Sequence, residues 1–118
     1  MKACEAIARA DELSPNAFSP EQKHRWLEEA EGQIYLEITK PTGKAEDIPR
    51  VSDVTELTVP HPYSSLYVDY LVSMYARFCG EVNKYNNYLD EYNRKLDAFA
   101  KWYVRTHQST KRSIRIWR

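Results

Sequence analysis

The residues that could carry catalysis or bind a metal are scattered through the 118-residue chain. His24, His61 and His107 fall in three separate predicted elements, and Cys4 and Cys79 fit neither a zinc nor a disulfide framework. His24 shares a helix face with the glutamate four residues later, a spacing more typical of a surface contact than of a metal site. The chain has only three glycines and no phosphate-binding loop. We therefore expect no enzyme activity, no metal and no cofactor.

Tyrosine is the other chemically notable residue, because seven of the nine tyrosines lie between residues 67 and 103. Their rings could stack on nucleic-acid bases while Lys and Arg contact phosphates, but acids such as Asp90 and Glu91 interrupt that surface. Tyrosine also suits a protein interface, since it buries area while its hydroxyl finds a partner. We expect about half of the seven to build the core, and predict Tyr85, Tyr88 and Tyr92 as interface aromatics.

Acidic and basic residues balance at 17 each but are unevenly divided along the chain. Residues 1–57 hold seven Lys/Arg against twelve Asp/Glu, whereas residues 58–118 hold ten against five. The two halves, at −5 and +5, could neutralise each other within one fold. Alternatively, copies could stack head to tail through unlike faces, because complementary fields orient partners.

Helix signals dominate the amino-terminal third. A short helix is predicted over about 2–13 and a second over about 20–39, the latter capped by Ser19 with Pro20 at its first position. Gly32 lies inside the second helix, where glycine costs about 1 kcal/mol relative to alanine. A close crossing with a long carboxy-terminal helix would offset that cost, so Gly32, the nearby Trp26 and Gly80 are predicted helix-crossing and packing residues.

Residues 63–106 carry apolar side chains at spacings of 3 and 4, a heptad-like stripe. The stripe keeps its phase across Gly80, a residue that could either kink one helix or reverse the chain. The continuous phase favours one long helix with a kink at Gly80.

Residues 40–61 and 108–118 lack the helical pattern. Proline and glycine punctuate 40–61, which predicts a long loop or hairpin excursion. Residues 108–118 contain no acids and alternate β-forming with basic side chains, which predicts an extended basic arm that adds a strand to an exposed sheet edge. A frayed terminus and contact with DNA are the alternatives. The predicted contact residues of the arm are Lys111, Arg112, Ile114, Arg115, Ile116, Trp117 and Arg118.

Together these patterns predict a mainly α protein. One small helical bundle with a long carboxy-terminal helix spans residues 1–107, and the extended arm follows it. The first residues include acids where a signal peptide needs an apolar run, and no stretch approaches the roughly 20 apolar residues of a membrane span. We expect a reduced, intracellular or virion-borne protein without membrane contact.

Three segments carry recognisable packing motifs: SPEQKHRWLEEAEGQIYLEI (19–38), ELTVPHPYSSLYVDYL (56–71) and FCGEVNKYNNYLDEYNRKLDAFAKWYVRTH (78–107). Over most of residues 5–107 the chain resembles head–tail connector, or neck adaptor, proteins of tailed bacteriophages and prophages of Gram-positive bacteria. The resemblance implies a homo-oligomeric ring that docks under the portal, contacts other neck and tail proteins, and passes DNA through its channel without sequence readout. It also implies a place in the virion neck after assembly in the bacterial host cytoplasm.

Two other functions remain open. The chain could be a small helical nucleic-acid-binding protein that uses its basic carboxy-terminal half, in which case binding would fall steeply with salt. It could also be a host helical regulator. That module needs only two or three helices, so the loop and the arm count against it.

Overall fold

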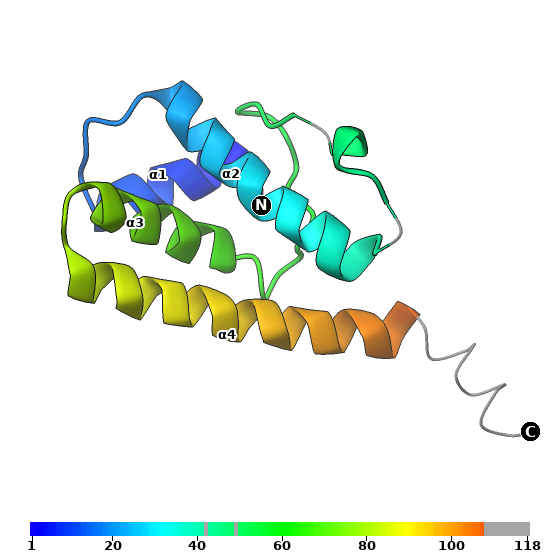
Figure 1. Cartoon of the computed structure of the whole chain (residues 1–118). Helices are drawn as coiled ribbons and strands as arrows, with labels where there is room; N and C mark the ends of the chain where they lie inside the picture. The colour runs from blue at the N-terminus through cyan, green and yellow to red at the C-terminus, as the bar shows by residue number, and fades with distance from the viewer. Residues whose placement is uncertain (42, 49, 108–118) are drawn as a thin grey trace, which may run out of the picture.

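The structure is a computed structural model that describes residues 1–41, 43–48 and 50–107. Four α-helices, α1 (Ala3–Leu13), α2 (Pro20–Ile34), α3 (Leu66–Phe78) and α4 (Val82–His107), make up most of it (Figure 1). Two short elements, η1 (Tyr35–Thr39) and η2 (Ala45–Asp47), lie between α2 and α3. No β-strand occurs in the part of the chain that the structure describes. The mainly helical fold is therefore confirmed.

The two amino-terminal helices form where the sequence predicts them. The Ser19 hydroxyl accepts a hydrogen bond from the Gln22 amide at 3.2 Å, and Pro20 occupies the first turn, so the start of α2 is capped as expected. The helix does not stop at Ile34 but continues as η1, a single π-helical segment, to Thr39. The predicted helix over 20–39 is thus confirmed, with a wider last turn.

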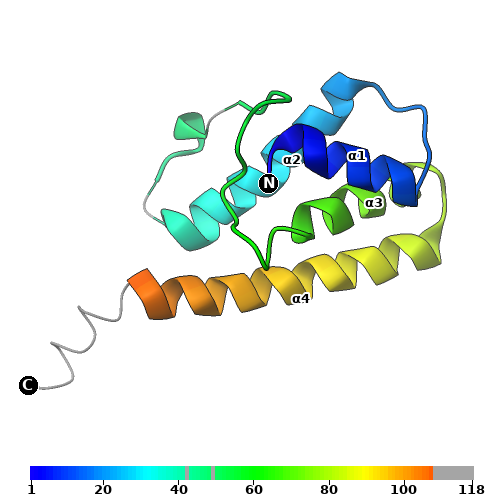
Figure 2. The same cartoon turned by 180° about the vertical axis from the view of Figure 1, so that it is seen from behind.

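The expectation of one long, kinked carboxy-terminal helix is wrong. The chain reverses at Gly80, and α4 runs back along α3 as an antiparallel hairpin (Figures 1 and 2). Tyr70 packs on Tyr92 with ring centroids 4.9 Å apart, and Asp69 pairs with Lys95. Gly80 has φ of +76°, in the left-handed region that glycine enters without a side-chain clash. The heptad-like spacing of apolar residues continues across Gly80 because α3 and α4 pack their apolar faces against each other.

Helix α3 lies at the centre of the molecule. Figure 2 shows α1 and α2 on one side of it and α4 on the other. All residues from Leu66 to Ala76 are buried, which is the pattern of a helix covered on all sides. The apolar stripe of α2 and the inner face of α4 complete the core, with Leu27, Ala30, Ile34, Leu96 and Phe99 buried among others.

The described residues between η1 and α3 form no β-hairpin, and part of this excursion is firmly anchored. Val51, Leu57 and Val59 are buried in the main core. The backbone carbonyls of Thr55 and Asp53 accept hydrogen bonds from the first amides of α1, at 2.9 Å and 3.0 Å. These amides have no partner within their own helix, so the segment serves as a backbone cap for α1. Residues 51–59 of the excursion are therefore a fixed part of the bundle.

Candidate interaction surfaces

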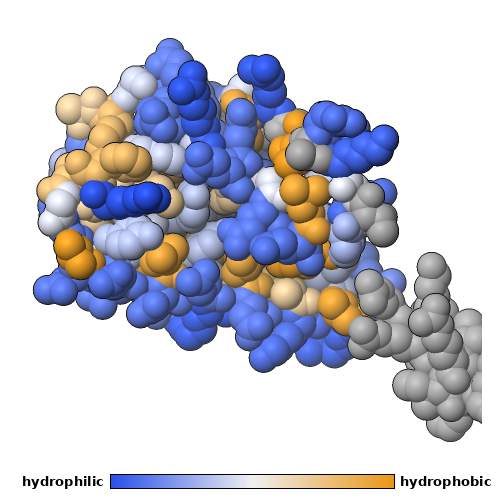
Figure 3. All heavy atoms as spheres, in the orientation of Figure 1, coloured by the Kyte–Doolittle hydropathy of each residue, from blue (hydrophilic) through white to orange (hydrophobic). Residues whose placement is uncertain are grey.

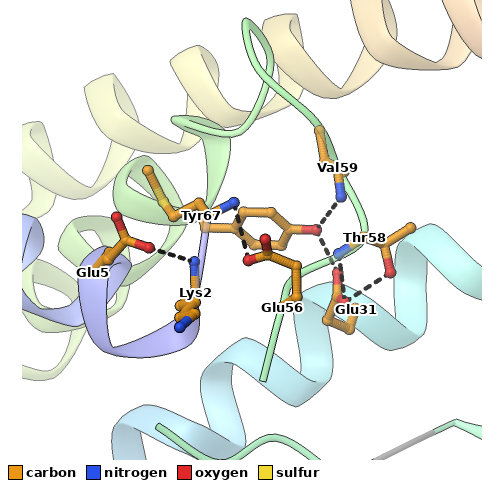
Figure 4. Close-up of polar contacts among 8 residues, drawn as sticks. Lys2, Glu5, Glu31, Glu56, Thr58, Val59 and Tyr67 are labelled. Atoms are coloured by element: carbon orange, nitrogen blue, oxygen red, sulfur yellow. Dashed lines mark hydrogen bonds and ion pairs between the residues drawn. The ribbon is translucent and has the colours of Figure 1, made fainter. Parts of the chain in front are cut away.

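A buried polar cluster joins α2, α3 and the segment before α3 (Figure 4). The Glu31 carboxylate accepts hydrogen bonds from the amide and hydroxyl of Thr58 at 3.0 Å and 2.8 Å, and from the Tyr67 hydroxyl. Tyr67 in turn accepts from the Val59 amide at 2.9 Å. Burial beside Glu31 raises the pKa of Tyr67 well above its usual value, so the phenol stays a neutral donor. The cluster is fully hydrogen-bonded and holds the fold together.

Three glutamates close together on one helix, here Glu28, Glu29 and Glu31, are typical of a solvated face, but Glu31 does not lie on one. Only 6% of Glu31 is exposed. Its position gave a signal, because Glu31 lies four residues after Leu27 and three before Ile34, both of which belong to the apolar stripe.

A second polar cluster ties the end of α1 to α2 and α3. Asp11 accepts hydrogen bonds at 3.0 Å from the Tyr75 hydroxyl, the Lys23 ammonium and the Asn16 amide. Burial alone would raise the pKa of Asp11, but these donors outweigh it and lower the pKa below its usual value. The carboxylate is therefore a structural ion, since each of its three donors comes from another part of the bundle.

The third cluster joins α3 to α4. Asp69 pairs with Lys95 at 2.6 Å, with both side chains largely covered. Burial raises the pKa of Asp69 despite the neighbouring ammonium. The cost of burying the two charges therefore offsets most of their attraction, and the pair contributes little to the stability of the fold. Its geometry fixes the register of the hairpin.

The three predicted interface tyrosines do not form one surface. Tyr92 is 1% exposed, packs against Tyr70 and donates a hydrogen bond to Gln33 at 2.7 Å, so it is a core residue and its prediction as an interface aromatic is wrong. Tyr85 and Tyr88 are half-buried on α4. The sequence does not distinguish the buried tyrosine from the two half-buried ones, because all three follow one another at spacings of 3 and 4 along the same helix.

The predicted packing residues are placed differently from one another. Trp26 is buried in an aromatic cluster with Phe18, Tyr75 and Phe78, as expected of a packing residue. Gly32 is buried too, but its close neighbour is Ile48: a Cβ added at Gly32 would lie 3.1 Å from the Ile48 side chain. The predicted crossing with the long carboxy-terminal helix is therefore wrong at this position. Gly80 is exposed, and a Cβ added there meets no heavy atom within 4 Å, so its prediction as a packing residue is wrong as well.

Apolar side chains are exposed at the end of the molecule where α3 turns into α4. Phe78 and Val82 flank the turn and are 61% and 65% exposed, and Leu13, at the end of α1, is 55% exposed. Both ribbon views place the end of α1 and this turn at the same end of the molecule (Figures 1 and 2), and Figure 3 shows apolar side chains gathered over the turn. We name Leu13, Phe78 and Val82 the turn-end surface. Sequence reasoning missed it because a continuous helix would have buried Phe78 and Val82.

A groove of about 540 Å³ runs along the outer face of α2 and is closed on one side by Ile48. Its floor is apolar, and its rim carries three glutamates and one arginine. We name it the α2 groove, and its lining comprises Arg25, Glu28, Glu29, Gly32, Gln33, Leu36, Glu37 and Ile48. The sequence gives no sign of the groove, because Ile48 lies in the loop after η1 and comes close to Gly32 only in the folded chain.

The basic residues of α4 are mostly neutralised within the bundle. Of its five Lys and Arg side chains, four pair with carboxylates within 4.0 Å. The pairs are Lys84 with Glu81, Arg94 with Glu91, Lys95 with Asp69 and Lys101 with Asp97. Although α4 lies in the positively charged half of the sequence, it therefore has no continuous basic face.

The remaining predicted contact residues belong to the arm, and residues 108–118 lie outside the described residues. Within the described ranges, no three His, Cys, Asp or Glu side chains come together in a way that could hold a metal ion. No helix in the same ranges is long and apolar enough to cross a membrane.

Comparisons with known proteins add no relative to this description. No protein-family model matches the chain, and neither the curated proteins nor the solved structures yield a significant match. The turn-end surface and the α2 groove are therefore the features that bear on function.

Proposed function

We propose that this protein is a structural connector of tailed-phage particles, which forms a homo-oligomeric ring in the virion neck below the portal and contacts portal and tail proteins. The turn-end surface is the observation that carries the proposal. It leaves Leu13, Phe78 and Val82 more than half exposed to water, whereas Tyr75, Tyr92, Leu96 and Phe99 of the same two carboxy-terminal helices are buried. Burying one such side chain fully against a neighbour would contribute about 1.5–3 kcal/mol.

The shape of the bundle supports the same function. α4 has 26 residues, so it is about 39 Å long, and it connects the turn-end surface to the end from which the arm continues. A subunit with contact regions at opposite ends can bridge different neighbours in a ring or between stacked components. The polar clusters around Glu31, Asp11 and Asp69 keep the two ends in fixed relation.

The nucleic-acid alternative has less support in the described residues. Most α4 cations already pair with carboxylates, and Tyr67, Tyr70, Tyr75 and Tyr92 are buried rather than available for stacking. Under the connector proposal, DNA passes the ring without base contacts. The arm, residues 108–118, is then available to a portal or tail protein.

The proposal is tested by particle mass and by imaging. Sedimentation of the full chain over a concentration series, alone and with a portal ring, should show a ring-sized species that the double variant Phe78→Ser/Val82→Ser fails to form. Val54→Ser is the matched control, because Val54 is 74% exposed but lies in the loop segment away from the turn. Cryo-EM of the portal mixture should show the chain as a ring below the portal. A chain that stays monomeric with the portal present, or a double variant that assembles like the control, contradicts the proposal.

A further inference from the structure

We propose that in the unassembled protein the α2 groove holds the chain's own basic segment, residues 111–118. The inference is independent of the connector function, since it concerns one molecule of the chain. It rests on the apolar floor of the groove, on the charges of its rim, and on the place where the described chain ends.

The floor of the groove suits apolar side chains at alternate positions. Gly32 has no side chain, and Leu36 and Ile48 are half-buried beside it, so their remaining apolar surface faces the groove. In an extended segment, residues two apart point to the same side. Ile114 and Ile116 have this spacing, so both can contact the floor at once.

The rim has the charge opposite to that of the segment. Glu28, Glu29 and Glu37 line the groove against a single Arg25. Among the described side chains, none of the three carboxylates has a basic partner within 4.0 Å. The segment brings four cations, namely Lys111, Arg112, Arg115 and Arg118. Charge complementarity of this kind sets which segment binds and in which orientation.

The described chain ends close to the groove. Near the end of α4, the Tyr103 hydroxyl lies 3.5 Å from the Thr39 carbonyl oxygen, and Thr39 is two residues beyond the rim residue Glu37. Eleven residues follow His107, and at about 3.3 Å per residue they reach roughly 36 Å. A tethered segment has an effective concentration in the mM range. The chain's own segment is therefore favoured over that of a second copy.

Disulfide trapping in the full chain tests the proposal. In a Cys4→Ser/Cys79→Ser background, Ser113→Cys is combined with Leu36→Cys on the groove floor. The control combines Ser113→Cys with Glu12→Cys, an exposed position on α1. We expect the groove pair to form an intramolecular disulfide at least tenfold faster than the control pair. If Leu36→Cys impairs folding, the exposed rim residue Glu37 replaces it as the cysteine position.

Charge dependence is the second readout. High salt should slow trapping severalfold, because rim and segment charges are then screened. Replacing Glu28, Glu29 and Glu37 by glutamine should slow it similarly. A glutamine oxygen can still accept the hydrogen bonds that the Val51 amide and the Tyr70 hydroxyl donate to Glu28 and Glu29 at 3.3 Å and 3.1 Å, and thermal melting of the variant checks that the fold is kept. An intramolecular disulfide with this charge dependence supports the proposal. Trapping no faster than the control overturns it, and so does a disulfide-linked dimer, which would show that the groove takes the segment of another copy.

Discussion

The Tyr67 hydroxyl of α3 donates a hydrogen bond to the Glu31 carboxylate of α2, across 36 positions of sequence. The same hydroxyl accepts from the Val59 amide, and Glu31 accepts from Thr58. One tyrosine and one glutamate thus join two helices to the segment that caps α1. Because Tyr67, Val59 and Glu31 are buried, loss of the Tyr67 hydroxyl leaves its partners without compensation from water.

Tyr67→Phe should destabilise the protein. The change removes only the hydroxyl, but it leaves the Val59 amide without its acceptor and removes a donor from Glu31. A buried polar group left unsatisfied costs about 1–3 kcal/mol. Urea unfolding of the full chain, followed by circular dichroism, measures the change in free energy of unfolding.

Tyr88→Phe is the control for that substitution. Tyr88 is half-buried on α4, and its hydroxyl makes no hydrogen bond to another described residue. Its loss should change the free energy of unfolding by less than about 0.5 kcal/mol. Equal effects at Tyr67 and Tyr88 would contradict a structural role for the buried cluster.

Alkaline pH should destabilise the fold through its buried tyrosines. The pKa values of Tyr67, Tyr70, Tyr75 and Tyr92 are all raised above 10.0, first of all by burial. Unfolded tyrosines lose their protons near pH 10, whereas these four keep them in the folded state. The folded state then binds more protons than the unfolded state, so stability is fully present below pH 10 and falls as pH rises above it.

The expected slope is about 1.4 kcal/mol per pH unit for each tyrosine that stays protonated. Unfolding free energies measured in urea at a series of pH values from about 8 to 11 check this, with ultraviolet absorbance reporting tyrosinate. Tyr92→Phe should flatten the slope by one tyrosine's share. A stability that does not change above pH 10 would show that these phenols ionise without unfolding.

The positions of the helices could be predicted from the sequence because local chemistry sets them. The Ser19–Pro20 start of α2 and its buried Leu27, Ala30 and Ile34 follow from capping and periodicity within one helix. The same reasoning failed at Gly80. Helical phase measures spacing within a helix, and it stays continuous whether the next helix extends the first or packs back on it.

Surfaces made by distant segments were harder to predict than the helices. The turn-end surface exists only because the chain reverses, and the α2 groove only because Ile48 returns to Gly32. Tyr92 and Tyr88 have similar sequence surroundings, yet one is in the core and the other at its edge. The division of charge along the sequence does indicate where acidic surface lies, since the glutamates on the rim of the groove belong to the negative half of the chain.

Gly32 and Ile48 should show coupled effects on stability. Gly32→Ala gains about 1 kcal/mol in helix propensity, but its Cβ would lie 3.1 Å from the Ile48 side chain, which must shift. We expect little net change from Gly32→Ala alone. In an Ile48→Ala background the same substitution should stabilise by about 1 kcal/mol.

The measurement is a double-mutant cycle in urea, with unfolding free energies for the wild type, both single variants and the double variant. A coupling energy of about 0.5–1 kcal/mol supports the contact between these two residues. Additive effects would show that Ile48 does not restrict position 32 in solution.

Gly80 should be required for its backbone conformation and not for space. Its φ of +76° lies in the left-handed region, while a Cβ built there meets no heavy atom within 4 Å. Gly80→Ala should therefore cost about 1–2 kcal/mol, the usual penalty for an L-residue in this conformation. Gly80→Asn should cost less, because asparagine tolerates left-handed geometry better than alanine. Thermal and urea unfolding of the three proteins check this order. If Gly80→Ala keeps the wild-type stability, the turn does not require a positive φ. If both variants lose the same stability, a lack of space for a side chain is the cause, which would contradict the open surroundings of Gly80.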